Sequence, residues 1–119
     1  RFVIYIMNEK ITKKHLDNLA LRINTITNSS INKKRIGSYY IAYGSEYENE
    51  KKGYELQQTF EYNKETNSIG WYTPLDTGYT TKRILYYSLC SFLVGLKIKV
   101  WNYITQNIKR NMKDIFYLL

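Results

Sequence analysis

The sequence predicts an α+β fold, a small three-stranded antiparallel sheet with helices packed on one face, in the order α-β-β-β-α-α. Two observations support this prediction. Apolar residues recur at helical spacing near both ends of the chain, but with a period of two between positions 39 and 73. A chain of 119 residues allows one domain and one core. We therefore expect 1–119 to be a single domain, with 1–9 as an N-terminal arm or extra strand and 99–119 as a C-terminal helix.

The first helix has clear start and stop signals. Thr12 is a suitable N-cap because its hydroxyl can accept a hydrogen bond from a backbone N–H of the first turn. Apolar residues then follow at helical spacing, and Asn28-Ser29-Ser30 is typical of a helix end. The stripe that this helix would bury consists of Leu16, Leu19, Ile23 and Ile26.

Three strands are expected in the middle of the chain. The first covers 39–44, where Tyr39, Ile41 and Tyr43 alternate with Tyr40, Ala42 and Gly44. The second covers 54–62 and has one apolar and one polar face, which predicts a sheet covered on one side only. The third covers 68–73 and ends before Pro74, which cannot donate a ladder hydrogen bond.

Two further helices are predicted after the sheet. The central one starts after a second capping threonine and has an apolar stripe of Leu85, Leu89, Phe92, Leu93 and Leu96. Gly95 lowers helix propensity by about 1 kcal/mol relative to alanine, so we expect a bend or an end near 95–99. The terminal helix has a stripe of its own, formed by Trp101, Ile104, Ile108, Met112, Ile115 and Leu119.

The net charge of +8 is distributed unevenly. Residues 1–45 carry +6, residues 46–65 carry −3 and residues 66–119 carry +5. This polarity favours attraction of a polyanion by the two basic parts and repulsion by the acidic hairpin between them. A solvated, soluble surface explains the same charge equally well.

Cysteine content and hydropathy indicate a compartment. The single cysteine, Cys90, excludes an internal disulfide, and no secretory signal is visible, so we expect a cytoplasmic protein. The apolar run 84–96 is 13 residues long, which is too short to span a bilayer. We therefore expect no membrane partner.

The sequence has few residues suited to catalysis. His15 is the only histidine, and no HxH, HExxH, CxxC or glycine-rich phosphate loop occurs. Glu46, Glu48 and Glu50 could form a divalent-cation site, although such a run is more often a solvated loop. We expect a protein that is not an enzyme, with no cofactor and no metal.

Binding of phosphate groups is better supported. A helix N-terminus attracts anions, and both predicted helix starts carry a threonine followed by two cations. A third basic cluster lies in the connector after the first helix. The predicted nucleic-acid-binding residues are Lys13, Lys14, Lys33, Lys34, Arg35, Thr81, Lys82 and Arg83.

Two resemblances follow from these motifs. The order α-β-β-β-α with Thr81-Lys82-Arg83 opening the second helix resembles the double-stranded RNA-binding domain, whose equivalent helix start meets phosphates. The acidic loop SEYENEKKG departs from that family, which carries a Gly-Pro and a histidine there. The segments 12–16, 39–44 and 80–96 also resemble short uncharacterised proteins of phages and mobile elements, which implies an accessory role.

A protein-binding accessory, or an inhibitor of a host factor, is the alternative. Tyrosine and tryptophan are enriched at protein interfaces, and the hairpin is rich in tyrosine. The terminal helix could instead pair in a homodimer. The candidate residues for protein interaction are Tyr43, Tyr54, Tyr62, Trp101 and Ile108.

Overall fold

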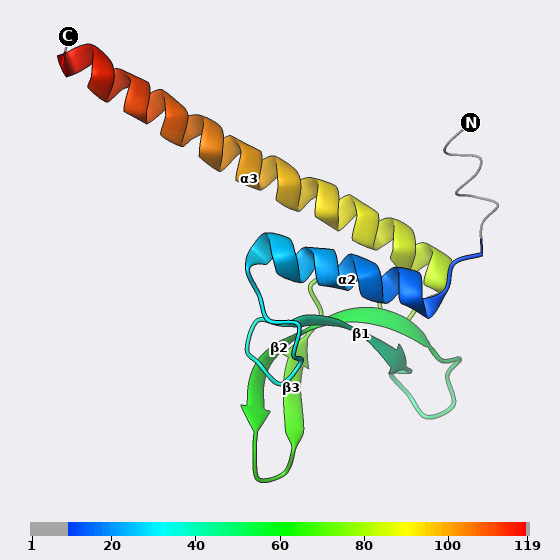
Figure 1. Cartoon of the computed structure of the whole chain (residues 1–119). Helices are drawn as coiled ribbons and strands as arrows, with labels where there is room; N and C mark the ends of the chain where they lie inside the picture. The colour runs from blue at the N-terminus through cyan, green and yellow to red at the C-terminus, as the bar shows by residue number, and fades with distance from the viewer. Residues whose placement is uncertain (1–9, 119) are drawn as a thin grey trace.

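The predicted α+β class is confirmed. The computed structural model describes residues 10–118, with side chains as far as residue 113, so the predicted arm or strand at 1–9 lies outside the described residues. In chain order the elements are α2 (Lys13–Thr27), β1 (Tyr39–Gly44), β2 (Gly53–Asn63), β3 (Ser68–Tyr72) and α3 (Lys82–Leu118). Figure 1 shows α2 and the first part of α3 side by side above the sheet, with α3 running on beyond it.

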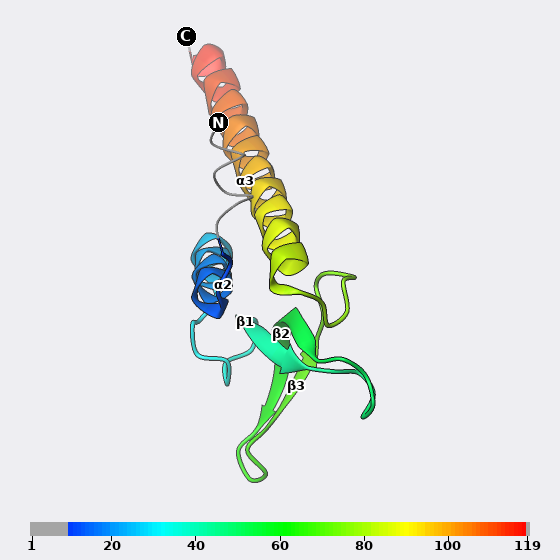
Figure 2. The same cartoon turned by 90° about the vertical axis from the view of Figure 1, so that its right-hand side faces the viewer.

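The sheet is antiparallel throughout, with β2 in the centre. Tyr39 pairs with Gln58 at one end of the β1–β2 ladder, and Gly44 pairs with Gly53 at the other. The register between β2 and β3 shifts between Thr59 and Glu61, where a bulge bends the long central strand. Figure 2 shows the β2–β3 hairpin extending away from the two helices.

Helix α2 begins and ends where the sequence predicts. Thr12 is its N-cap and forms a capping box with His15, whose Nδ1 accepts from the Thr12 backbone N–H at 3.0 Å. The histidine therefore closes the helix start. Asn28 ends the helix in the left-handed conformation, with φ of 57°, which asparagine tolerates better than most residues.

One core lies between the two helices and the sheet. Its centre is apolar and fully enclosed: Leu16, Ile23, Leu85 and Leu89 are each 0% exposed. The apolar face of β2 meets them through Leu56. Asn24 then ties α2 to the sheet, because its amide donates to the Tyr39 carbonyl at 2.9 Å and accepts from the Tyr39 N–H at 2.8 Å.

The expectation of a sheet covered on one side only is wrong for the central strand. The polar face of β2 is also buried, with Glu55, Gln57 and Thr59 at 6%, 4% and 1% exposure. Thr59 pairs with the connector before β1, donating its hydroxyl to the Lys33 carbonyl. At the other end Gln57 donates to the Tyr79 hydroxyl at 3.2 Å. Two irregular connections therefore cover the face that the polar pattern assigned to solvent.

The two helices predicted after the sheet are helical but continuous. α3 runs for 37 residues through Gly95 without a break. A Cβ placed on Gly95 would have no neighbour within 4 Å, so the glycine lies on an open part of the helix surface. Its propensity cost of about 1 kcal/mol is too small to end a helix whose preceding turns are held in the core.

Because α3 is continuous, its apolar helical stretch is longer than the run 84–96 recognised in the sequence. By length and composition, Lys82–Lys113 suffices to cross a membrane, so the expectation of an apolar run too short to span a bilayer is wrong. Core helices of soluble proteins pass the same test, but only 17% of this apolar stretch is buried. The first part of this stretch has a core role here, because Leu85, Leu89 and Leu93 are buried against α2 and the sheet.

Candidate nucleic-acid interface

A short backbone bridge fixes the start of α3 against the sheet. The Tyr54 N–H donates to the Thr80 carbonyl at 2.7 Å, and the Thr80 N–H donates to the Tyr54 carbonyl at 2.9 Å. Gly53 makes this approach feasible, since a Cβ there would lie 2.7 Å from both the N and the O of Thr80. The β1–β2 loop and the N-terminus of α3 are thereby held together.

Three lysines gather at this bridge. A cavity of about 360 Å³ is lined by Lys51 and Lys52 from the β1–β2 loop and by Lys82 from the first turn of α3. The Lys82 ammonium lies 6.0 Å from the centroid of the ring of Tyr54, which also lines the cavity, at the outer limit of a cation–π contact. Two segments 30 positions apart in the chain therefore supply one basic site.

The start of α3 adds backbone dipoles to these charges. Thr81 is the N-cap, since its hydroxyl accepts from the Ile84 N–H at 3.3 Å and its carbonyl from the Leu85 N–H at 3.0 Å. The aligned peptide dipoles place partial positive charge at this end of the helix. An anionic oxygen in the cavity would meet lysine ammonium groups and the positive end of the helix together.

A buried polar cluster supports one wall of this cavity. Gln57 Nε2 donates to Glu55 Oε1 at 2.8 Å and to the Tyr79 hydroxyl at 3.2 Å, which positions the Tyr79 ring that lines the cavity. Burial raises the pKa of Tyr79 above its usual 10.0, and the nearby Glu55 carboxylate raises it further. Tyr79 therefore remains a neutral phenol at physiological pH.

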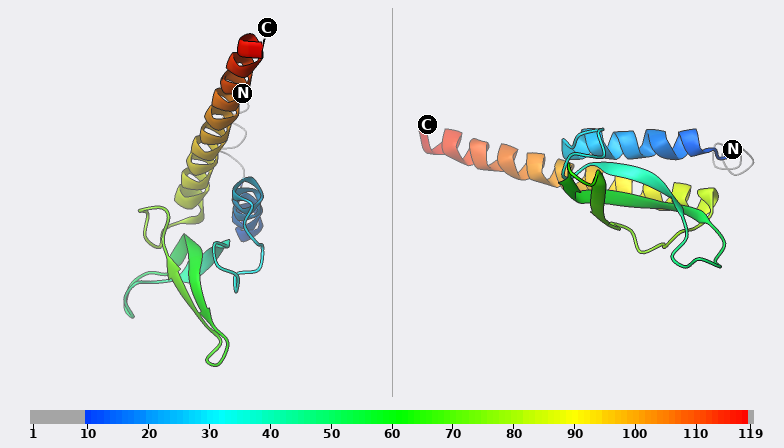
Figure 3. Two further views of the ribbon diagram at one scale, coloured as in Figure 1. Left: turned by 90° about the vertical axis from the view of Figure 1, so that its left-hand side faces the viewer. Right: turned by 90° about the horizontal axis from the view of Figure 1, so that it is seen from below.

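The predicted cations at the two helix starts lie at one end of the molecule. Two views agree that α2 and α3 run side by side with their first turns at the same end, where the β1–β2 loop also lies (Figures 1 and 3). Lys13 is partly neutralised there, because its ammonium lies 3.0 Å from Asp17 Oδ2. Lys14 and Arg83 are exposed.

The predicted connector cluster lies elsewhere. Lys33, Lys34 and Arg35 follow the C-terminal end of α2, at the opposite end of that helix from Lys13. Lys34 places its ammonium 5.7 Å from the centre of the Tyr62 ring in the β2–β3 hairpin. The structure therefore divides the predicted nucleic-acid-binding residues between two ends.

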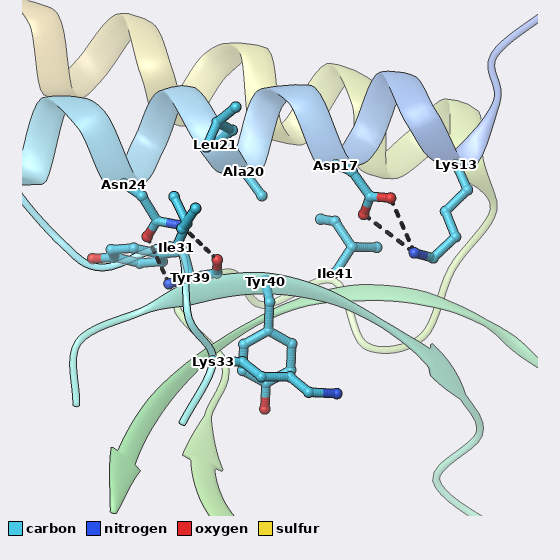
Figure 4. Close-up of a pocket in the computed structure, with 10 residues that line it drawn as sticks. All are labelled: Lys13, Asp17, Ala20, Leu21, Asn24, Ile31, Lys33, Tyr39, Tyr40 and Ile41. Atoms are coloured by element: carbon cyan, nitrogen blue, oxygen red, sulfur yellow. Dashed lines mark hydrogen bonds and ion pairs between the residues drawn. The ribbon is translucent and has the colours of Figure 1, made fainter. Parts of the chain in front are cut away.

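A groove beneath α2 runs between these two groups. It has a volume of about 290 Å³, and its lining includes Lys13 with Asp17, and Lys33 with Tyr40 (Figure 4). The Lys13–Asp17 ion pair occupies one part of the groove and the Asn24–Tyr39 backbone pair another. Because most of its polar groups are already paired, this groove is a weaker anion site than the cavity at α3.

The residues predicted for protein interaction do not form one surface. Tyr43 and Tyr54 contact each other, with ring centroids 4.8 Å apart. Tyr62 lies farther along the β2–β3 hairpin, where its hydroxyl donates to Asn67 at 2.7 Å. Trp101 and Ile108 are on the later part of α3 and are 67% and 54% exposed.

Sequence reasoning missed Lys51 and Lys52. They were grouped with the glutamates of the acidic hairpin, whose net charge is negative. Glu46, Glu48 and Glu50 are exposed in the same loop, and no three acidic, histidine or cysteine side chains among the described residues gather as metal ligands would. The only sequence signal for these cations was the Lys-Lys-Gly that ends the loop. The backbone pairing of Tyr54 with Thr80 could not be deduced from the spacing of residues in the sequence.

Comparison with known proteins gives no guide to function. No family model, no curated protein and no solved structure matches the chain.

Proposed function

We propose that this chain is a small non-enzymatic accessory protein that binds nucleic acid through the phosphate backbone. The observation that carries the proposal is the convergence of Lys51, Lys52 and Lys82 on one cavity at the N-terminus of α3. A phosphate carries anionic oxygens that suit ammonium groups and helix N-terminal amides. Thr81 and Arg83 belong to the same helix start and complete the proposed contact surface.

Such contacts position a nucleic acid but carry little sequence information. The cavity offers lysine ammonium groups and the positive end of a helix, which suit phosphate oxygens, so we infer binding of low sequence specificity. The order α-β-β-β-α and the cationic start of α3 favour duplex RNA, in keeping with the resemblance to double-stranded RNA-binding domains. We also propose that the chain comes from a phage or mobile element, as the second resemblance implies.

The proposal is tested by fluorescence anisotropy with labelled duplex RNA, duplex DNA and single strands, each titrated across salt concentrations. Three phosphate contacts on a duplex predict a slope of log K against log salt of about −3, because each neutralised phosphate contributes about −0.9. Tighter binding of duplex RNA than of duplex DNA is the expected preference. Absence of binding to every one of these probes at low salt would refute the function.

A further inference from the structure

The later part of α3 leaves the domain and exposes large apolar side chains. Figure 1 shows the helix continuing past the end of α2 and away from the sheet. Trp101 is 67% exposed there, and Ile108 and Met112 are each 54% exposed. Isolated apolar residues are common on protein surfaces, whereas a series of large ones along one helix is typical of an interaction surface.

Most exposed apolar residues of α3 follow one line along the described helix, whereas Val100, Tyr103 and Ile104, at 43%, 68% and 45% exposure, lie off it. Ile84, Val94, Ile98, Trp101, Ile108 and Met112 all fall on positions separated alternately by three and four residues. Tyr87, at 40% exposure, occupies another position of this repeat, and Ser91 and Thr105 fill the remaining ones. A strict alternation of three and four has a period of 3.5 residues, which is the repeat of a coiled coil.

This line, which we call the seam, lies on the opposite side of α3 from the core. The core uses Leu85, Leu89 and Leu93, which stand at other helical positions and are at most 6% exposed. Ile84 and Val94 lie beside them in sequence but are 54% and 57% exposed, so neither α2 nor the sheet covers this part of the seam. Farther along, Trp101 borders a cavity with Ile26 of α2 but remains 67% exposed. α3 is therefore apolar on two sides, and only one of them is used within the domain.

We propose that the seam binds the α3 helix of a second copy of this chain, as a parallel, in-register, two-stranded coiled coil. In-register pairing places each seam residue opposite the same residue of the second copy. Ser91 then faces Ser91, Thr105 faces Thr105, and each apolar layer is apolar on both helices. The Thr105 hydroxyl already donates to the Trp101 carbonyl at 2.8 Å, so burial leaves it satisfied. An antiparallel pair would instead set these polar layers against apolar ones.

The flanking positions of the repeat also permit parallel pairing. In a parallel pair, the residues that flank the seam on one helix contact flanking residues of the other helix. Lys97 of one copy would face Asn102 of the other, and Ile104 would face Lys109, so these contacts bring no like charges together. The exposed cations of this part of the helix, including Lys99, Arg110 and Lys113, point to the outside of the pair by their place in the repeat.

The seam is large enough for a specific dimer. Seven apolar side chains, each about half exposed, would bury roughly 100 Å² apiece, or roughly 1,400 Å² over two copies. This exceeds the ~1,000 Å² expected of a biological interface. A lipid surface fits less well, because a bilayer has no preference for a 3.5-residue repeat and because Leu85, Leu89 and Leu93 of the same stretch are held in the domain core.

Sedimentation equilibrium of the full chain tests the proposal. We expect a reversible dimer of twice 14.3 kDa that becomes monomeric in Ile98→Glu, since this residue is 55% exposed and its charge would enter the seam without disturbing the core. Gln106→Glu introduces the same charge on the outer side of the helix and should leave the dimer intact. A monomer at all concentrations, or a dimer that tolerates Ile98→Glu, would overturn the proposal.

Cysteine cross-linking tests the orientation. In a Cys90→Ser background, Thr105→Cys should form a disulfide-linked dimer on mild oxidation, because only parallel in-register pairing brings position 105 next to its own copy. Gln106→Cys is the matched control and should remain unlinked. A dimer without the Thr105→Cys link would contradict the parallel register. A monomer that co-sediments with phosphatidylcholine–phosphatidylglycerol vesicles would assign the seam to lipid instead.

Discussion

Tyr54 and Thr80 are joined by two reciprocal backbone hydrogen bonds of 2.7 and 2.9 Å. This isolated pair lies outside the regular ladders. It links the second residue of β2 to the residue before the N-cap of α3. Because Lys51 and Lys52 directly precede β2, and Lys82 opens α3, the pair fixes the spacing between the cations of the proposed phosphate site. The geometry of the site thus depends on backbone contacts rather than on the lysine side chains alone.

The first prediction concerns Gly53, which makes this contact possible. In Gly53→Ala the new methyl group would lie 2.7 Å from Thr80 N and O, so the strand and the start of α3 must separate. We expect a loss of about 1–3 kcal/mol in the free energy of unfolding, measured by urea denaturation, and weaker binding of duplex RNA. Gly95→Ala is the control, since a Cβ there meets no atom within 4 Å. Equal effects of the two substitutions would contradict the role given to Gly53.

The second prediction concerns the alkaline limit of stability. Folding raises the pKa of Tyr79 above 10.0, so above this pH the unfolded chain loses the phenolic proton before the folded chain does. Stability associated with Tyr79 is therefore present below pH 10.0 and declines as the pH rises through the folded pKa.

Tyr79→Phe removes this ionisation. Its free energy of unfolding should fall less steeply between pH of about 8 and about 11 than that of the wild type, as followed by urea denaturation. A constant loss of about 1 kcal/mol from the missing hydrogen bond to Gln57 should accompany it. Tyr47→Phe, at a residue 67% exposed, serves as control. A steeper fall in Tyr79→Phe would show the sign to be wrong.

The third prediction compares two leucines on the same helix. Leu16 is 0% exposed and Leu21 is 47% exposed, although both are on α2. Leu16→Ala should lower the free energy of unfolding by about 2–5 kcal/mol, because it leaves a cavity between α2 and the sheet. Leu21→Ala should change it by no more than about 0.5 kcal/mol. Similar losses in both variants would mean that the core is not where the structure places it.

Local signals predicted most of the fold. Thr12 and Asn28 bound α2 as their side-chain chemistry indicates, and the period of two in 39–63 marks β1 and β2. Gly95 misled the prediction of a break in α3, because one glycine cannot outweigh the burial of Leu89 and Leu93 on either side of the preceding turn. The 3.5-residue seam was present in the sequence, but the core stripe on the other side of the helix concealed it.

The candidate site was predicted only in part. Thr81, Lys82 and Arg83 followed from the helix start, whereas Lys51 and Lys52 join them through a pairing between distant parts of the chain. A two-residue bridge has no periodicity that sequence reasoning could detect. For the same reason the burial of Glu55 and Gln57 was not foreseen, since irregular connections rather than a helix cover them.

The most direct test of the phosphate site compares two double variants with equal charge. Lys52→Ala/Lys82→Ala removes two cations from the cavity, and Lys64→Ala/Lys113→Ala removes two exposed cations elsewhere. In salt titrations with labelled duplex RNA, the first should flatten the slope of log K against log salt by about 2 and lower the affinity at every salt concentration. The second should leave the slope close to that of the wild type. Equal weakening by both variants would show that only overall charge attracts the nucleic acid, and would contradict a site at the start of α3.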